Sequence, residues 1–189
     1  MDGNNKILLN APYYSQWRDV KDADWQYRSC GIASLKMAMD FFDNADGNLS
    51  LDGLIKEGLS LGAYKPDVGW IHEGLVLIAK KHGFENSFRK EWPNVESPAL
   101  PAGRSVSNKN GVGIIVSILE ENIPVLASVK SGTGGHLILL IGFKKESDAL
   151  KGFYYHDPDA KKASEGMNKF ICAKDFLGLW KGRVIVAKK

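Results

Sequence analysis

Residues 30–42, CGIASLKMAMDFF, begin abruptly after a polar segment that ends at Ser29. Their large apolar side chains recur at helical spacing on one face: Ile32, Leu35, Met39 and Phe42. This period predicts a buried amphipathic helix, with Ser29 as its N-cap. Cys30 would then lie in the first turn of a helix that packs into the core.

Around this helix, helical patterns come first along the chain and strand patterns later. We predict further helices at 50–59, 70–83, 112–121 and 175–180, and strands at 123–129, 137–143, 152–155, 169–172 and 183–187. Residues 6–14 indicate an extended N-terminal arm, and the prolines within residues 92–103 predict a long loop that borders a substrate cleft. This order is typical of the α+β class, with N-terminal helices packed on a C-terminal antiparallel sheet.

Length and composition exclude several classes of protein. The 189 residues, 44% of them hydrophobic, predict a single domain over residues 1–189 with an ordinary core. The net charge of +3 is spread along the chain, so we expect no nucleic-acid partner. No apolar run approaches the roughly 20 residues of a membrane span and the start lacks a signal-peptide pattern, so we expect no membrane partner and a cytoplasmic location. A chain trimmed of its leader would read the same and be secreted.

The two cysteines, Cys30 and Cys172, occupy different settings and predict no disulfide framework. Cys172 lies in an apolar strand and is interpreted as a small core residue. At Cys30, the free N–H groups of the first helical turn and the helix dipole favour a thiolate. Gly31 beside it is interpreted as leaving space for a substrate carbonyl. Cys30 is therefore a candidate nucleophile, although a buried structural cysteine explains this single feature equally well.

A cysteine nucleophile needs a base, and His136 is the candidate. It follows a glycine-containing loop at residues 131–135 and opens the apolar strand at 137–143, where a polar side chain would face a cleft. His72 and His82 lie among charged residues of a helix and are interpreted as solvated surface groups.

A catalytic imidazole also needs a partner that fixes its orientation, and Asp157 is the candidate. If residues 137–143 and 152–155 form an antiparallel hairpin that turns near residues 146–147, His136 and Asp157 lie opposite each other at its open end. Their side chains would then share a face.

An oxyanion formed during acyl transfer needs hydrogen-bond donors. The backbone N–H of Cys30 is one candidate, and the side-chain amide of Gln16 is a second. The cluster of His156, Asp157 and Asp159 lacks paired cysteines or a second histidine at ligand spacing, so we predict no metal site and no cofactor.

Taken together, these residues resemble the papain-like peptidases of the bacteriocin-processing, double-glycine-leader type and their free-standing relatives. The family pattern appears here, in order, as four short motifs: Pro12-Tyr13-Tyr14-Ser15-Gln16, Cys30-Gly31-Ile32-Ala33-Ser34, Gly135-His136 and Asp157-Pro158. Ile32 departs from the proline common in the family, which is favourable but dispensable in the first helical turn. The transporter domain to which leader peptidases are fused is not apparent in the sequence, so the double-glycine specificity is not carried over.

The resemblance implies a papain-like fold with Cys30 as nucleophile, His136 as base and then acid, Asp157 as its orienting residue and Gln16 as oxyanion donor. The expected activity is cleavage of a peptide or other amide through a thioester on Cys30. Two alternatives stay open: an acyltransferase or transpeptidase with the same three residues, and a silent peptide-binding module. The expected partner is the peptide or amide substrate, and the sequence does not predict an oligomeric state.

Overall fold

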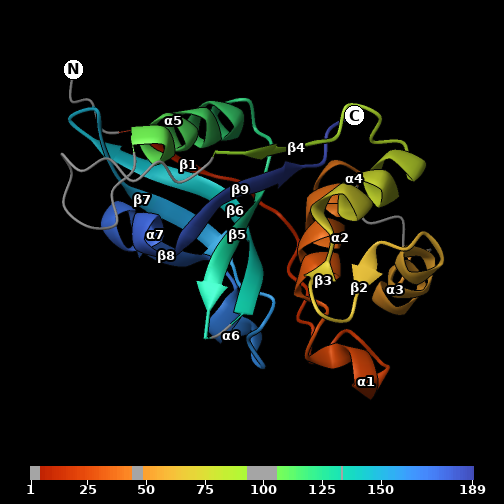
Figure 1. Ribbon diagram of the computed structural model, residues 1–189. Coiled ribbons are helices and arrows are strands. Elements are labelled where there is room, and N and C mark those ends of the chain that lie inside the picture. Colours follow the sequence, from red (N-terminus) through yellow and green to blue (C-terminus); the bar gives the residue numbers. More distant parts are fainter. Residues whose placement is uncertain (1–4, 44–48, 93–105, 133) are drawn as a thin grey trace.

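Helices dominate the first part of the chain in the computed structural model, which describes residues 5–43, 49–92, 106–132 and 134–189. The first four are α1 (Ala23–Gln26), α2 (Cys30–Asp43), α3 (Leu51–Ser60) and α4 (His72–Lys81). Between α3 and α4, the short strands β2 (Tyr64–Lys65) and β3 (Gly69–Trp70) pair with each other. Figure 1 shows these elements gathered on one side of the molecule.

The second part is an antiparallel sheet with the strand order β4-β9-β5-β6-β7-β8, in which β1 also pairs with β6. Its strands are β1 (Asn5–Leu8), β4 (Phe88–Glu91), β5 (Val125–Ser131), β6 (Gly134–Glu146), β7 (Ala149–His156), β8 (Lys169–Cys172) and β9 (Trp180–Val186). Three more helices accompany it: α5 (Val106–Glu120), α6 (Ala163–Gly166) and α7 (Ala173–Leu179). The predicted α+β architecture is therefore confirmed.

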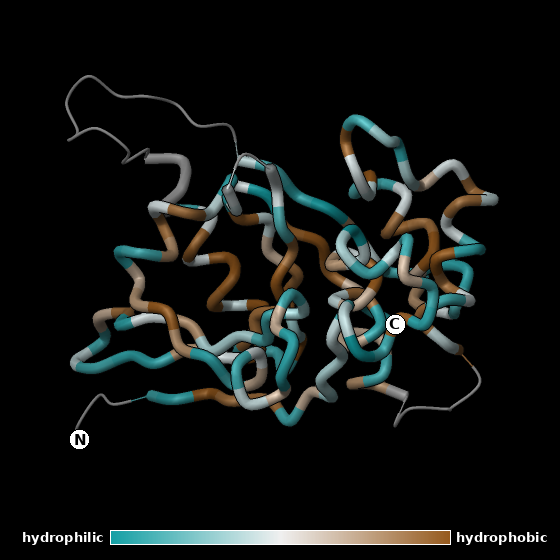
Figure 2. The backbone as a smooth tube through the Cα atoms, turned by 90° about the horizontal axis from the view of Figure 1, so that it is seen from below, coloured by the Kyte–Doolittle hydropathy of each residue, from teal (hydrophilic) through white to brown (hydrophobic). Residues whose placement is uncertain are grey.

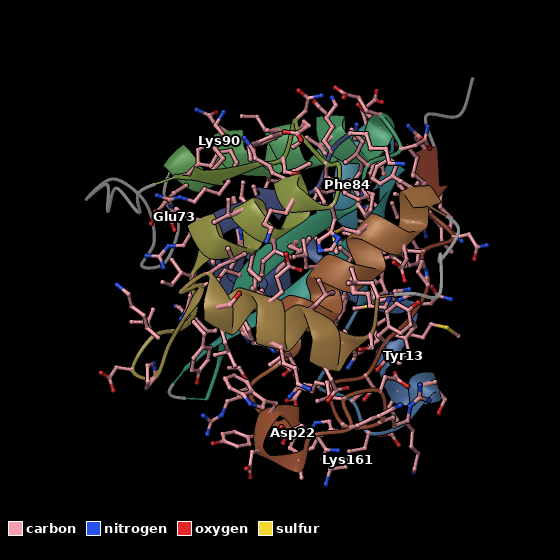
Figure 3. The ribbon with its side chains drawn as sticks, turned by 90° about the vertical axis from the view of Figure 1, so that its right-hand side faces the viewer. Tyr13, Asp22, Glu73, Phe84, Lys90 and Lys161 are labelled. Atoms are coloured by element: carbon pink, nitrogen blue, oxygen red, sulfur yellow. The ribbon has the colours of Figure 1, made fainter. Side chains whose placement is uncertain are left out.

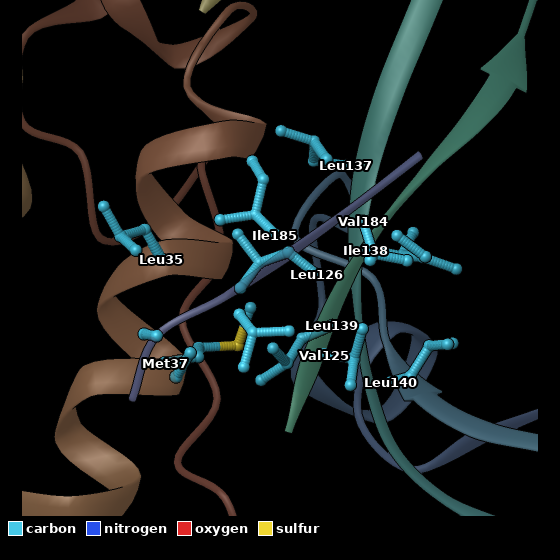
Figure 4. Close-up of a cluster of buried hydrophobic side chains, with 14 of the residues drawn as sticks. Leu35, Met37, Val125, Leu126, Leu137, Ile138, Leu139, Leu140, Val184 and Ile185 are labelled. Carbon is cyan, nitrogen blue, oxygen red and sulfur yellow. The ribbon is translucent and has the colours of Figure 1, made fainter. Parts of the chain in front are cut away.

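Helix α2 joins the two parts, because it contacts both β5 and β6 of the sheet as well as α3 and α4. Figure 4 shows Leu126 and Ile185 of the sheet beside this helix, and both are fully buried. Leu35 and Met37 of the helix are likewise buried. In Figure 2, hydrophobic stretches of the chain lie inward and hydrophilic stretches lie along the outer loops. Burial of these side chains anchors Cys30, the first residue of α2, against the sheet.

The hairpin of β6 and β7 is present as predicted, but it turns one residue later than the sequence predicts. Glu146 pairs with Ala149, and the two residues between them have positive φ, 48° at Ser147 and 61° at Asp148. Such a two-residue turn matches the twist of an antiparallel pair. The hairpin thus places the start of β6 and the end of β7 at the same end of the sheet.

Some elements were not predicted. All four residues of β4 are exposed, so this strand lacks the apolar alternation that would have marked it. Residues 93–103 of the predicted cleft loop lie outside the described residues. Within the described ranges, no helix is both long enough and apolar enough to cross a membrane.

Candidate active site

Cys30 begins α2 at a point that several contacts hold in place. The Ser29 carbonyl accepts the first helical hydrogen bond from Ala33 N–H (2.9 Å), while the Ser29 hydroxyl donates to the Trp25 carbonyl (2.6 Å). The indole of Trp70 donates to the Arg28 carbonyl, at 2.8 Å. Ser29 therefore has the N-cap position predicted for it, although its hydroxyl turns back to the preceding helix.

The interpretation of Gly31 needs correction. A side chain at this position would lie 3.2 Å from each of Leu137, Leu75 and Trp70, and Gly31 itself is buried. The absent side chain thus allows α2 to pack closely against its neighbours, and it does not leave the room for a substrate carbonyl that we predicted from the sequence.

His136 lies near the start of β6, where it pairs with Val129 of β5. Its Nε2 atom is 2.8 Å from Asp157 Oδ1. The last pair of the β6–β7 ladder joins Leu139 to His156, so Asp157 follows directly at the open end of the hairpin. Continued by one residue, that register brings Asp157 level with Ile138, which makes it a diagonal neighbour of His136 on one face. The predicted contact between the side chains of His136 and Asp157 is confirmed. The prediction that the two residues lie directly opposite each other in the hairpin was wrong.

The main chain around Asp157 is fixed by contacts from distant segments. Asp157 N–H donates to the Gly166 carbonyl (2.8 Å), and the Tyr13 hydroxyl donates to the Asp157 carbonyl (2.9 Å). Figure 3 shows Tyr13 beside the short helix α6, which ends at Gly166. The carboxylate of Asp157 also accepts the Asp159 N–H (3.1 Å) and lies 3.7 Å from Lys169 Nζ. The acceptor for His136 is therefore held rigidly.

The electrostatics of the imidazole favour its charged form. Burial lowers the pKa of His136. Hydrogen bonds to Asp157 and Cys30, together with the charges of both residues, outweigh this effect and raise the pKa to about 10. At Asp157, burial raises the pKa, but the hydrogen bond and charge of His136 outweigh it and leave the pKa below its usual value. Because Asp157 occupies Nε2, Nδ1 is the nitrogen left for Cys30. The three side chains thus form one chain of contacts from sulfur to carboxylate.

Gln16 lies beside the Asp157 loop. Its N–H donates to the Pro158 carbonyl (2.9 Å) and its side-chain Nε2 donates to Asp159 Oδ1 (2.8 Å). The side chain is only 3% exposed, and Oε1 is buried without a hydrogen-bond partner among the described residues. One N–H of the amide is used by Asp159 and the other remains available. Its role as an oxyanion donor stays a prediction.

The remaining histidines differ from one another. His156 is 1% exposed; Nε2 faces the Ala11 carbonyl (3.1 Å) and Nδ1 accepts the Asn168 N–H (3.0 Å), so both nitrogens serve the backbone. His82 is partly buried, and its Nε2 lies 2.7 Å from Glu57 Oε2. His72 was wrongly assigned to a solvated face: it is half-buried in the wall of a cavity, where burial and then the charge of Arg183 lower its pKa.

That cavity, of about 760 Å³, opens between the helical part and the sheet. Cys30 lies on the helical wall and His136 on the sheet wall. The volume falls in the range of small-molecule and peptide sites. Other wall residues come from the β2–β3 region and from β4 and β9: Asp67, Trp70, Arg89, Glu91, Lys181 and Arg183. Gln16 is not part of this wall. Across the described ranges, no group of three or more His, Cys, Asp or Glu side chains is arranged to hold a metal ion.

Comparisons with known proteins agree with this geometry. A family model described as "Peptidase_C39 like family" matches residues 8–187. Among solved structures, the fold is similar to the crystal structure of a candidate C39-like peptidase from Bacillus anthracis, with a TM-score of 0.60, 14% identity and 98% of each chain covered. No curated protein sequence matches the chain. At this identity the structural likeness concerns the fold, and it confirms the predicted papain-like α+β arrangement.

Proposed function

Because the chain belongs to the Peptidase_C39 like family, we propose that it is a cysteine peptidase whose nucleophile is Cys30. The observation that carries this proposal is the contact chain at the cavity wall, in which His136 interacts with Cys30 and lies 2.8 Å from Asp157. A helix-start thiol, a buried imidazole and a fixed carboxylate are the groups that thiol-dependent acyl transfer requires.

In the first half of the reaction, the Cys30 thiolate attacks the carbonyl carbon of the scissile amide and forms a carbon–sulfur bond. The carbonyl electrons move to oxygen, giving a tetrahedral oxyanion. On collapse, the carbon–nitrogen bond breaks and the Nδ1 proton of His136 passes to the leaving amine. A thioester on Cys30 remains, together with a neutral imidazole.

In the second half, His136 Nδ1 removes a proton from a water molecule, and the resulting hydroxide attacks the thioester carbon. The carbon–sulfur bond breaks, the carboxylic acid product leaves, and the thiolate and imidazolium are restored. Asp157 keeps Nε2 protonated throughout, so the same nitrogen acts as acid and then as base.

The raised pKa of His136 predicts the alkaline limb of the pH profile. The imidazolium is the proton donor to the leaving amine, and it is lost only as the pH rises through about 10. We therefore expect kcat/KM to fall on the alkaline side near pH 10, well above the ordinary histidine range. Asp157→Asn removes a hydrogen bond and a charge that raise this pKa, so the limb should move to lower pH.

The measurement is kcat/KM for an uncharged quenched peptide between about pH 5 and about pH 11, with circular dichroism at each end to show that the protein stays folded. An alkaline limb at the same pH in wild type and Asp157→Asn would contradict the assigned pairing.

Gln16 is proposed as a side-chain donor to the oxyanion. Gln16→Ala should lower kcat by about 10²-fold with little change in KM, because the oxyanion exists only beyond the ground state. Gln26→Ala is the matched control, since it also removes a glutamine amide that donates one hydrogen bond; the acceptor of Gln26 is the Val20 carbonyl, at 3.0 Å, whereas that of Gln16 is the Asp159 carboxylate. If Gln16→Ala turned over within about twofold of wild type, the oxyanion role would be excluded.

A further inference from the structure

Arg28 stands two residues before Cys30 and lines the same cavity. Its guanidinium lies 4.2 Å from the Tyr27 ring centroid and 5.5 Å from that of Trp25. The Nε atom is buried without a hydrogen-bond partner, and the side chain forms no ion pair with any carboxylate of the described residues. Arg28 is thus a partly buried cation that has no carboxylate partner in the described part of the chain.

The other two arginines of the cavity wall differ in this respect. Arg89 lies 2.8 Å from Glu73 and 3.2 Å from Glu91, and Arg183 lies 2.7 Å from Glu91. Their charges are shared with carboxylates of the protein itself. The contrast singles out Arg28 as the guanidinium of the wall that is free to accept an external anion.

The surroundings of Arg28 suit it to bind a carboxylate. Stacking on an aromatic face holds the guanidinium plane and leaves its edge, which carries the N–H donors, for a second partner. A planar carboxylate matches that edge with two parallel hydrogen bonds. A charged group that is removed from water without a hydrogen-bond partner costs free energy. A carboxylate bound to the guanidinium of Arg28 would offset the cost of burying Nε.

The local backbone keeps Arg28 at a fixed place relative to the thiol. The Trp70 indole donates to the Arg28 carbonyl at 2.8 Å, and Cys30 starts the helix directly after Ser29. Because Arg28 and Cys30 line the same cavity, a substrate bound there for attack by Cys30 shares that cavity with Arg28.

We propose that Arg28 binds a side-chain carboxylate of the substrate, so that the cavity selects peptides with an acidic residue close to the scissile bond. This specificity role rests on the proposed peptidase function of Cys30. The reacting groups alone do not provide a preference for acidic substrates.

The test uses pairs of quenched peptides in which glutamate is placed in turn at each position near the cleaved bond, each with a glutamine twin. At one position, we expect wild type to cleave the glutamate peptide about tenfold faster in kcat/KM than its twin. Arg28→Gln should bring that ratio to about one. Arg28→Lys should restore it in part, because an ammonium keeps the charge but lacks the planar fork.

Lys181→Gln is the matched control, because it removes a positive charge from the same cavity wall. Lys181 Nζ contacts the Gly134 carbonyl at 3.2 Å and likewise has no ion pair within the part of the chain that the structure describes. If a contact with Arg28 causes the preference, Lys181→Gln should keep the ratio of kcat/KM between the glutamate peptide and its glutamine twin. If the overall electrostatic potential of the cavity causes it, Lys181→Gln should lower this ratio.

The carboxylate assignment fails if no position favours glutamate in wild type, or if the ratio is unchanged in Arg28→Gln. Binding of the twins to Cys30→Ala, with and without Arg28→Gln, gives the same comparison without turnover. The peptidase proposal fails separately, if wild type cleaves none of the peptides or Cys30→Ala cleaves them as well.

Discussion

Cys30→Ala is expected to reduce peptide cleavage to the uncatalysed background. The sulfur is the atom that forms the thioester, and Cys30 provides the only thiol among the described residues of the cavity wall. Loss of a nucleophile from a catalytic set of this kind lowers kcat by about 10⁶-fold. The fold should persist, since the change removes one sulfur atom from a partly exposed position at the start of α2.

Cys172→Ala is the matched control for this loss. Cys172 was predicted as a core residue, but it is also only partly buried, at the end of β8, and is the N-cap residue of α7. Both variants should have melting temperatures close to that of wild type. Only Cys30→Ala should lose turnover and labelling by a thiol-directed peptide electrophile. Activity that survived in Cys30→Ala would exclude the proposed nucleophile.

His136→Gln is expected to lower kcat by about 10⁴-fold, because the imidazole serves both as the acid that releases the amine and as the base that activates water. Glutamine has similar bulk but cannot carry a proton between these steps. The thiol remains in place, so slow labelling of Cys30 should continue while turnover nearly ceases.

His82→Gln provides the comparison for that result. His82 contacts Glu57 and does not line the cavity that holds Cys30 and His136. Its activity should stay within about twofold of wild type. A His136→Gln protein with comparable activity would remove the imidazole from the mechanism.

Patterns local in sequence predicted the frame of the site. The helical period after Ser29 placed Cys30 at a helix start, and the polar turn between two apolar segments predicted the hairpin that brings Asp157 to His136. Both features depend on side-chain spacing within one or two elements, which the sequence displays directly.

Features that depend on distant contacts were missed. The position of the β6–β7 turn was also missed by one residue. It lies at Ser147 and Asp148, and this displacement gives His136 and Asp157 their diagonal register, because the two irregularities in the pairing of the strands cancel. A Cβ at Gly142 would collide with the Ile7 carbonyl of β1, a contact that no local pattern reveals.

Charge environments were equally hidden. Arg28 is indistinguishable in sequence from any loop arginine, and the contrast appears only once Arg89 and Arg183 are seen to pair with Glu73 and Glu91, whereas Arg28 has no such pair among the described residues. Likewise, His72 follows a helical pattern with charged neighbours, but it lies half-buried in the cavity wall, and burial lowers its pKa. Burial of this kind results from packing between parts of the chain that lie far apart in sequence.

The most direct measurement of the thioester on Cys30 is the mass of the intact protein during turnover of an activated peptide ester, followed by mapping of the modified fragment. We expect a transient mass increase equal to the acyl group, located on the fragment that contains Cys30, which disappears as the substrate is consumed and persists in His136→Gln. Turnover without any acylated protein, or acylation at a residue other than Cys30, would contradict the proposed mechanism.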